Sequence, residues 1–339
     1  MKVFVTGGGG YLGTSLVPEL LARGHRVTVV DRFFFGDQVF GSLSAHPALR
    51  LVRDDVRWFD GSLLAGHDAV IDMAALSNDP AGALDPWKTF DINYLGRVRV
   101  ARLAREAGVA RYVLTSSCSV YGFRDGVLDE TTPPNPLTAY ARANVLAESD
   151  TLPLGGPAFC PSAVRFATLY GLSGRMRFDL AVNAMVLGAR GSGKIPIMKD
   201  GTQWRPFLHV RDAARALIEM LEKDPDLLRG QRFNIGADDQ NYQIAKLAEL
   251  IAASMTPHPV LEWYGDPDRR SYRVSFRRAR EDLKFLPRLT PVEATREIDA
   301  ALASGTLVPT TRERTVDWYR HLLEDKAAAE AVAIRGVVL

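Results

Sequence analysis

Cysteine is scarce in this chain of 339 residues, which contains only Cys118 and Cys160. The two thiols have neither disulfide nor metal spacing, so a reducing, cytoplasmic environment is expected. The six histidines form no i, i+4 pair, and no metal site is predicted. Because no apolar run approaches ~18 residues, the sequence contains no candidate membrane span. The formal net charge is only +2 and forms no basic stripe, which argues against a nucleic-acid partner.

What the chain does contain is a glycine-rich motif, TGGGGYLG at residues 6–13, directly after the apolar segment 2–5. A strand that enters a glycine turn and then a helix presents backbone N–H groups to the pyrophosphate of a dinucleotide. The helix is expected from Leu12 to Arg23, and Gly24 stops it. The turn residues predicted to contact the cofactor are Gly7, Gly10, Tyr11, Leu12 and Gly13.

A second apolar run, residues 26–30, ends at Asp31, eighteen residues after Gly13. An acidic side chain at this place accepts hydrogen bonds from both hydroxyls of the adenosine ribose, and its charge repels a 2′-phosphate. The predicted cofactor is therefore NAD in preference to NADP, although Arg32 beside it leaves some tolerance of NADP. Four consecutive glycines would also suit a flexible loop, but the strand, the helix and the acid in register favour dinucleotide binding.

Short apolar runs alternate with helical patterns through the first half of the chain. The expected strands are 51–52, 69–73, 112–116 and 162–166, and the expected helices are 86–107 and 138–150. Such alternation predicts an α/β fold with a Rossmann-type, doubly wound parallel sheet.

After residue 170 the pattern becomes irregular, and the segments 207–210 and 233–236 look like returns to the first domain. We therefore expect a Rossmann domain over residues 1–170 with returns near 205–236, and a smaller, interleaved C-terminal domain that binds the substrate. That second domain comprises residues 171–204 and 237–325, followed by a tail over residues 326–339 with a frayed terminal helix. A ligand would lie over the carboxyl ends of the strands, between the two parts.

A cluster of hydroxyls, at Ser116, Ser117 and Ser119, stands at the carboxyl end of the strand 112–116, and Tyr140 lies in the first turn of a later helix. A tyrosine phenol at such a place takes a proton from a substrate hydroxyl as hydride leaves its carbon, and a serine holds the same oxygen. Taken alone, Tyr140 also suits a packing position, and the serines would serve to cap a turn.

Together these segments resemble the extended short-chain dehydrogenase/reductase family, the NAD-dependent nucleotide-sugar epimerases and dehydratases, over about residues 1–325. The glycine motif is similar to the family's Thr-Gly-x-x-Gly-x-x-Gly, and Asp31 to its ribose-binding acid. The resemblance also implies an adenine-binding pair, a stretch under the pyrophosphate and nicotinamide ribose, and a buried structural asparagine. These positions are Asp55 and Val56, Ala74 and Ala75, and Asn93.

The same resemblance implies which residues are catalytic and which bind the substrate. Ser117, three residues before the segment Val120-Tyr121-Gly122, matches the catalytic Ser/Thr position, and Tyr140 matches the catalytic tyrosine. Asn183 and Arg205 match positions that contact a nucleotide diphosphate. The implied partner is a nucleotide diphosphate sugar, and the implied cofactor is NAD.

Two further places suit two interpretations each. Ser77 and Asn78 follow the strand 69–73, where a sugar would lie, but a turn or a helix cap explains them equally well. The densest basic stretch, residues 269–280, contains Arg270 and suits either a solvated face or a diphosphate-binding loop.

The chain departs from the family at residue 144, because the family's Tyr-x-x-x-Lys ends in Asn144 here. In the family the lysine binds the nicotinamide ribose and lowers the pKa of the tyrosine; Asn144 retains the means to bind the ribose but carries no charge. A nearby opposite charge is worth about 1–3 pKa units, so Tyr140 is expected to be a slow base, or turnover to be lost. Arg142 points away from the Tyr140–Asn144 face, and the positive nicotinamide ring compensates only in part.

A second departure concerns the reaction. The family's 4,6-dehydratases carry an acidic pair directly after the catalytic Ser/Thr, where this chain has Cys118 and Ser119, and neither is a good general acid near pH 7. The sequence therefore predicts a 4-epimerase or 4-dehydrogenase that acts through a 4-keto sugar, with a non-catalytic NAD- and nucleotide-binding protein as the alternative. The helices 86–107 and 138–150 resemble the pair that forms a four-helix dimer interface in this family, so a homodimer is expected.

Overall fold

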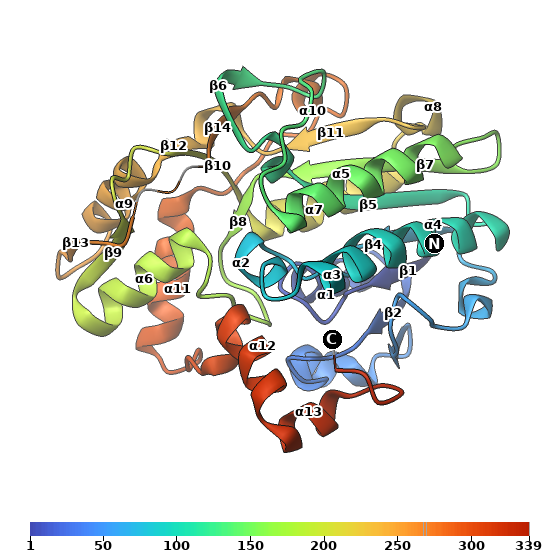
Figure 1. Ribbon diagram of the computed structural model, residues 1–339, viewed down its shortest axis with the longest axis horizontal. Helices are drawn as coiled ribbons and strands as arrows, with labels where there is room; N and C mark the ends of the chain where they lie inside the picture. The colour runs from blue at the N-terminus through green and yellow to red at the C-terminus, as the bar shows by residue number, and fades with distance from the viewer. Residues whose placement is uncertain (267, 269, 339) are drawn as a thin grey trace.

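A parallel, seven-stranded sheet is the centre of the computed structural model, which describes residues 1–266, 268 and 270–338 (Figure 1). In sheet order the strands are β11 (Arg232–Ile235), β7 (Cys160–Phe166), β5 (Arg111–Ser117), β4 (Ala69–Asp72), β1 (Lys2–Thr6), β2 (Arg26–Asp31) and β3 (Leu49–Arg53). The chain order reverses beside β1, which pairs with β2 on one side and β4 on the other. Such a reversal leaves a crevice at the carboxyl ends of the strands. This confirms the predicted Rossmann-type, doubly wound α/β fold.

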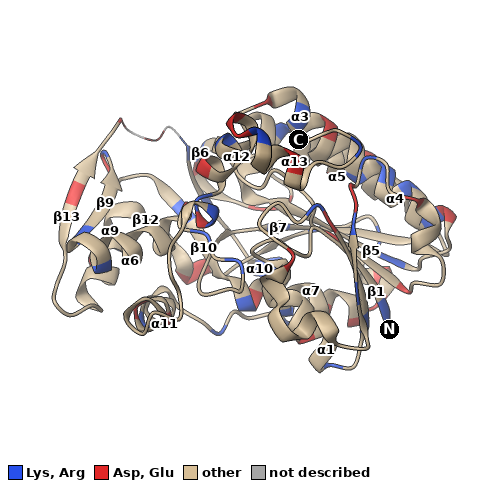
Figure 2. Ribbon diagram, turned by 90° about the horizontal axis from the view of Figure 1, so that it is seen from below, with Lys and Arg blue, Asp and Glu red and all other residues tan. Residues whose placement is uncertain are grey.

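Helices cover both faces of the sheet, as Figure 2 shows. One face is covered by α1 (Gly13–Ala22) and α7 (Val210–Glu222), and the other by α3 (Pro86–Phe90), α4 (Arg97–Glu106) and α5 (Ala139–Thr151). Alternation along β1 serves both layers, because Val3 and Val5 belong to the core under α1 and α7, and Phe4 to the opposite core.

The single helix expected over residues 86–107 is three consecutive segments. Between α3 and α4 the chain widens into a π-helical stretch, η3 (Asp91–Gly96). This stretch turns Asn93 into the interior, where its side-chain oxygen accepts a hydrogen bond from the Leu76 N–H (2.8 Å) and its amide donates to the Leu76 carbonyl (3.0 Å). A π-bulge of this kind is often found next to a functional site.

A smaller part of the molecule lies beyond the carboxyl ends of these strands. It contains a sheet of β12 (Asn241–Gln243), β10 (Trp204–His209) and β8 (Thr168–Tyr170), the pair β13 (Val260–Tyr264) and β9 (Lys194–Met198), and the helices α6 (Ala181–Ser192), α9 (Ile244–Ala253) and α11 (Pro291–Ala303). The expected strand at 207–210 therefore lies in this smaller sheet, whereas the segment 233–236 does return to the main one.

The remaining elements connect or flank these two parts. They are η1 (Gln38–Ala45), η2 (Gly61–Leu64), α2 (Asp79–Gly82), η4 (Cys118–Tyr121), β6 (Phe123–Leu128), which pairs with β14 (Ser271–Val274), η5 (Leu152–Leu154), α8 (Pro225–Leu228), η6 (Asp238–Gln240), α10 (Arg277–Glu281), η7 (Thr311–Glu313), α12 (Thr315–Glu324) and α13 (Lys326–Val332). None of the helices in the described part of the chain is long and apolar enough to cross a bilayer.

The tail is packed against the Rossmann domain rather than frayed. Its helix α13 lies near β2 in Figure 1, and Val332 is buried in the core cluster that also contains Phe4. Arg53 donates a hydrogen bond to the Ala331 carbonyl (2.5 Å), which holds the helix against β3.

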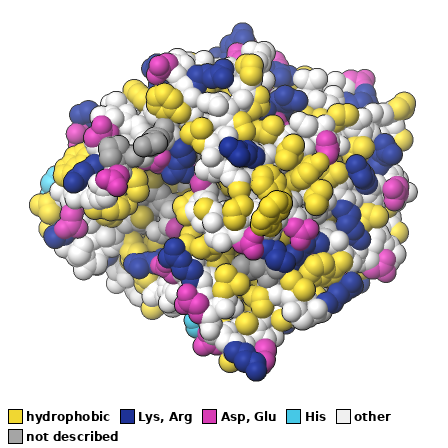
Figure 3. All heavy atoms as spheres, in the orientation of Figure 1, with side chains coloured by type: hydrophobic (Ala, Val, Ile, Leu, Met, Phe, Trp, Pro, Cys, Tyr) yellow, Lys and Arg dark blue, Asp and Glu magenta, His cyan; other side chains and the backbone are white. Residues whose placement is uncertain are grey.

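Apolar side chains gather on the outer face of α3, η3 and α5, which Figure 3 shows to the right of its centre. Trp87, Leu95 and Leu146 are exposed there, and Trp87 has 84% of its surface exposed. A helical face with several exposed large apolar residues is typical of a surface that another protein covers.

Candidate active site

A cavity of about 610 Å³ opens between the two parts of the molecule, over the carboxyl ends of the main-sheet strands. Its walls come from the β1–α1 turn, from the ends of β2, β4 and β5, from the start of α5, and from the segments that follow β8 and precede β14. This is the place at which doubly wound sheets bind their ligands.

The glycine turn has the shape that a dinucleotide requires. Gly7 has a φ of +68°, and a Cβ atom built on it would lie 2.7 Å from the Cα atom of Ala74. A Cβ on Gly13 would collide with the carbonyl of Gly8. Side chains are therefore excluded at both positions, which leaves the backbone N–H groups at the start of α1 open to a phosphate.

Asp31, at the end of β2, lies at the place expected for the ribose-binding acid. Its carboxylate accepts hydrogen bonds from the N–H of Gly9 (2.8 Å) and of Phe33 (2.6 Å), and it lines the cavity. Burial raises the pKa of this carboxyl. A carboxylate held by two backbone donors is well placed to accept hydrogen bonds from ribose hydroxyls.

Arg32 lines the cavity beside Asp31, but its guanidinium is held by acceptors of the protein. Its guanidinium donates to Asp55 Oδ2 (2.8 Å) and to the carbonyls of Val332 (3.2 Å) and Val337 (2.5 Å). Asp55 accepts further hydrogen bonds from Arg57, and these contacts outweigh burial and lower the pKa of Asp55. Since both terminal nitrogens of Arg32 are engaged, the geometry favours NAD over NADP.

Most of the other residues predicted to bind the cofactor line the cavity. Val56, Ala74 and Ala75 line the cavity, as do Gly10 and Leu12 of the glycine turn. Asn93 is fully buried and does not line it, and supports the wall through the backbone of Leu76. The donor set, the acid and the small residues together fit a dinucleotide bound along the strand ends.

Sequence reasoning missed a buried cation on this wall, Arg175. Its guanidinium lies 3.5 Å from the ring centre of Phe35, and its Nε has no hydrogen-bond partner. Burial, with the nearby Arg177, lowers the pKa of Arg175 to about 10. An incompletely partnered cation on the cavity wall suits an anionic ligand.

The three serines of the hydroxyl cluster differ in where their hydroxyls point: that of Ser116 is bonded in the interior, and those of Ser117 and Ser119 are at the cavity wall. Ser116 donates to Glu148 (2.6 Å), and that carboxylate also binds Arg165, so the Ser116 hydroxyl is committed to the interior. Ser117 ends β5, where its Oγ accepts a hydrogen bond from the Ser119 N–H (3.1 Å). The Ser119 hydroxyl is buried in the cavity wall and has no protein partner.

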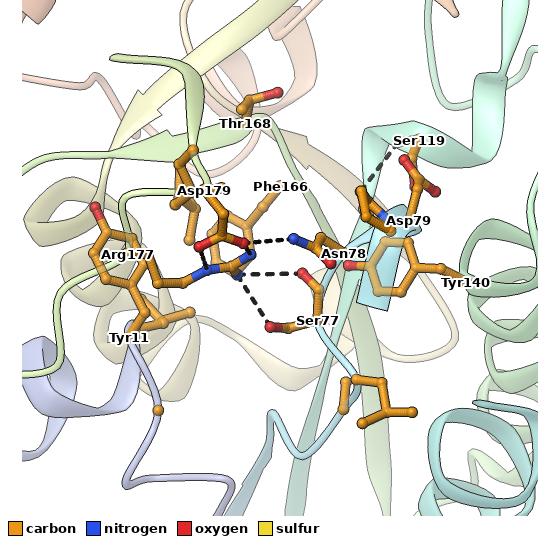
Figure 4. A pocket seen from close by; sticks show the side chains of 18 of the residues that line it. Tyr11, Ser77, Asn78, Asp79, Ser119, Tyr140, Phe166, Thr168, Arg177 and Asp179 are labelled. Carbon is orange, nitrogen blue, oxygen red and sulfur yellow. Dashed lines mark hydrogen bonds and ion pairs between the residues drawn. The ribbon is translucent and has the colours of Figure 1, made fainter. Parts of the chain in front are cut away.

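Tyr140 stands in the first turn of α5, which begins where Thr138 accepts a hydrogen bond from the Ala141 N–H (3.1 Å). Figure 4 shows Tyr140 and Ser119 on one side of the cavity, and Tyr11 and Arg177 on the other. Burial raises the pKa of the Tyr140 phenol, and the Asp79 carboxylate raises it further. Arg97, together with hydrogen bonding from Ser117 and Asn144, acts in the opposite direction.

Asn144 lies one turn after Tyr140 on the same helix. Its amide donates to the Tyr140 carbonyl (3.1 Å), and its side-chain oxygen accepts a hydrogen bond from Arg97 Nη1 (3.3 Å). Asn144 is buried and is not on the cavity wall, whereas Arg97 is on that wall.

Cys118 is directed away from the cavity. The thiol donates to the carbonyl of Arg165 (3.3 Å), and burial raises its pKa. The position therefore offers no general acid to a ligand in the cavity.

Two groups of ion-paired side chains on the cavity wall include or contact residues that the sequence predicted to bind the substrate. Arg177 donates to the hydroxyl of Ser77 (3.0 Å) and to Asp179, and Asp179 also accepts a hydrogen bond from Asn78 (2.6 Å), as Figure 4 shows. Asn78 caps α2 as well, through the Ala81 N–H. The cap interpretation of Asn78 thus holds, and the residue lines the cavity too.

Arg205 and Arg270 form the second group. Asp268 accepts hydrogen bonds from Arg205 (2.9 Å) and from Arg270 (2.8 Å), and Arg270 also pairs with Asp79. The basic stretch is thus a cavity wall at Arg270, while its first residue, Arg269, lies outside the described residues. Asn183 does not line the cavity, because its amide is fully engaged with Tyr11, Gly171 and Arg177.

The fold and the glycine turn define a Rossmann-type, dinucleotide-binding protein. A model of the NAD dependent epimerase/dehydratase family matches residues 3–236, and the chain belongs to that family, with NAD as its cofactor. In the described part of the chain, His, Cys, Asp and Glu form no cluster of three suited to a metal ion.

Relatives within the family carry several names. UDP-glucose 4-epimerase of Streptococcus mutans serotype c is 29% identical over 322 residues, which cover 86% of this chain and 94% of that protein. UDP-glucuronic acid decarboxylase 1 of Arabidopsis thaliana is 27% identical over 308 residues, 86% of this chain and 67% of that protein.

Solved structures agree with this placement. MoeE5 in complex with UDP-glucuronic acid and NAD has a TM-score of 0.78 and 29% identity, covering 90% of this chain and 100% of that one. UDP-N-acetylglucosamine 4-epimerase from Methanobrevibacter ruminantium M1 has a TM-score of 0.81 at 21% identity, over 90% of this chain and 98% of that one, which shows the fold alone.

Proposed function

We propose that the protein is an NAD-dependent enzyme that oxidises C4 of a nucleotide diphosphate sugar, as a 4-epimerase or a 4-dehydrogenase. The observation that supports this most is that Tyr140 and Ser117 line the same cavity as the glycine turn and Asp31. A proton acceptor and a hydride acceptor would therefore meet at one sugar carbon.

The residues divide the chemistry in a simple way. Tyr140, as phenolate, takes the proton of the C4 hydroxyl, and Ser117 donates a hydrogen bond to the same oxygen. Bound NAD supplies the acceptor for the hydride that leaves C4. The C4–H and O–H bonds break as the C4 carbonyl forms, and Tyr140 holds the released proton. The Ser119 hydroxyl, which has no hydrogen-bond partner among the described residues, is a further donor on the same cavity wall.

The two activities differ in the fate of the keto sugar. In a 4-epimerase the keto sugar turns its other face, the hydride returns to C4 from that side as Tyr140 returns the proton to the oxygen, and no reduced nicotinamide accumulates. In a 4-dehydrogenase the keto sugar leaves, and reduced nicotinamide is a product. A 4,6-dehydratase is disfavoured, because Cys118 is buried facing the Arg165 carbonyl and Ser119 is no acid near neutral pH.

The nucleotide proposed for the substrate is UDP. MoeE5 has been solved with UDP-glucose and with UDP-glucuronic acid, and the two structures match 91% and 90% of the present chain. Arg205 and Arg270 are the proposed diphosphate contacts, since both line the cavity and carry positive charge. Ser77, which also lines the cavity and accepts a hydrogen bond from Arg177, is the proposed sugar contact.

The test is sugar-dependent reduction of bound NAD, followed by the near-ultraviolet absorbance of reduced nicotinamide in a stopped-flow mixer. UDP-, GDP-, CDP- and dTDP-sugars are compared, and products are separated by chromatography. A transient signal with an epimeric product identifies an epimerase, and accumulating reduced nicotinamide identifies a dehydrogenase. Binding of NAD and nucleotide diphosphates without any hydride transfer would show a non-catalytic protein instead.

The homodimer also belongs to this proposal. The exposed residues Trp87, Leu95 and Leu146 lie on α3, η3 and α5, which are the helices expected at a four-helix interface. Light scattering is expected to give a dimer at micromolar concentration and a monomer for Leu95→Glu; a monomeric wild type would refute it.

A further inference from the structure

Arg97 is a buried cation within the candidate active site. It is the first residue of α4, only 1% of its surface is exposed, and it lines the cavity beside Thr115. Its Nη2 donates to the carbonyls of Asp72 (2.9 Å) and Thr115 (2.5 Å), at the ends of β4 and β5. These contacts anchor the guanidinium to the sheet edge over which the cavity opens.

The two ends of this guanidinium face different groups. Nε lies 3.7 Å from Asp72 Oδ2 and has no hydrogen-bond partner, while Nη1 donates to Asn144 Oδ1 at 3.3 Å. The Asp72 carboxylate is itself held by the hydroxyls of Thr6 and Tyr112. Asn144 therefore contacts the Nη1 end of the guanidinium, whereas the compensating Asp72 carboxylate lies at its Nε end.

Asn144 contacts both Arg97 and the backbone of Tyr140. It sits one turn after Tyr140, and its amide is tied to the Tyr140 carbonyl, so its oxygen is turned toward Arg97. Asp79 from α2 and Arg97 from α4 line the same cavity as Tyr140, and they raise and lower the pKa of its phenol respectively; Arg142, on its own helix, is exposed. Arg97 is thus the cation that accompanies the phenol inside the site.

We propose that Arg97 is a positioning residue whose positive charge, set beside Asn144, stabilises the phenolate of Tyr140, an inference that rests on the proposed role of Tyr140 as base. The charge that Asn144 lacks is then supplied from the neighbouring helix, and the departure at residue 144 leaves the site competent. Positive charge a few ångströms away is expected to lower the pKa of the phenol by about 1–3 units.

The test measures the ionisation of Tyr140 without any turnover. Protein labelled with fluorotyrosine is titrated by fluorine NMR, with and without NAD, and the Tyr140 signal is assigned by its absence from Tyr140→Phe. Arg97→Gln removes the charge and keeps an amide donor for the carbonyls of Asp72 and Thr115. Arg97→Lys keeps the charge, and Arg105→Met removes an exposed charge from the same helix.

Arg97→Gln is expected to raise the pKa of Tyr140 by about 1–3 units, Arg97→Lys to restore most of the shift, and Arg105→Met to change nothing. Where Arg97→Gln fails to fold, Arg97→Gln/Asp72→Asn removes both buried charges together and still raises the pKa, by less. An unchanged or lowered pKa in the charge-removing variant would overturn the proposal. Because the signal needs no substrate, this outcome is distinct from a failure of the proposed reaction, which would appear only in the turnover assay.

Discussion

Asp79 and Arg270 form an ion pair across 191 residues of sequence, on the wall of the cavity that also contains Tyr140. Thr138, the residue that caps α5, donates to the other oxygen of the same carboxylate. Asp79 therefore stands between the proposed diphosphate contact and the proposed base, and the two flanking groups of Tyr140, Asp79 and Arg97, carry opposite charges.

Asp79→Asn is expected to lower the pKa of Tyr140, because it removes the negative charge that raises it. The sign follows from the phenolate being the active form: activity increases with pH up to the pKa of the base, so a lower pKa moves that limb toward lower pH. A shift of about 1 unit is expected, measured from the pH dependence of kcat. Asp125→Asn, an exposed change on β6, is the control. A shift toward higher pH would contradict this assignment of charges.

Asn144→Lys is expected to destabilise the protein and not to improve it. The new ammonium would be buried against Arg97, and an uncompensated buried charge costs at least ~2 kcal/mol of unfolding free energy. Urea unfolding checks this, with Asn144→Met as the uncharged control.

The double variant Arg97→Gln/Asn144→Lys is then expected to recover part of that loss, with a coupling free energy of about 0.5–3 kcal/mol. If the changes in unfolding free energy of the two single variants simply add up in the double variant, the charges at residues 97 and 144 do not interact.

Gly7→Ala tests the glycine turn. A left-handed backbone costs an alanine about 1–2 kcal/mol, and at this position the new Cβ would also lie 2.7 Å from backbone atoms of Ala74. Gly24→Ala is the matched control, since its φ is +77° and nothing lies within 4 Å of its Cβ. Unfolding experiments and NAD calorimetry should show a larger loss of stability for Gly7→Ala and a loss of NAD affinity in that variant alone. If the two variants lose the same stability and the same NAD affinity, the close contact between residue 7 and Ala74 has no role in either.

Much of the Rossmann domain could be predicted because its signals are local. The strand β1, the glycine turn and Asp31 follow one another within residues 2–31, and each needs only neighbouring residues to be recognised. The smaller domain was harder, because an apolar run such as 207–210 specifies a strand but not the sheet that it joins. The π-helical stretch was also missed, since one added residue in a turn hardly changes the hydrophobic pattern of a helix.

The candidate site shows the same division. Ser117 and Tyr140 stand in recognisable motifs, whereas Arg97 is an arginine on a helix rich in arginine, where solvent exposure is the usual expectation. One signal was present: Arg97 is in phase with the buried residues Ala101 and Ala104, so helical periodicity places it in the interior. What the sequence did not give is that this interior lies against Asn144, since a contact between two helices is set by tertiary packing.

The role of Tyr140 as the base is tested most directly by comparing wild type with Tyr140→Phe for sugar-dependent reduction of bound NAD in a single turnover. The rate in the variant is expected to be lower by about 10²–10⁴-fold, the usual contribution of a general base. NAD affinity by calorimetry is expected to stay unchanged, because the dinucleotide contacts lie on the glycine turn and Asp31. A Tyr140→Phe protein that reduces bound NAD as fast as wild type would show that Tyr140 is not the base.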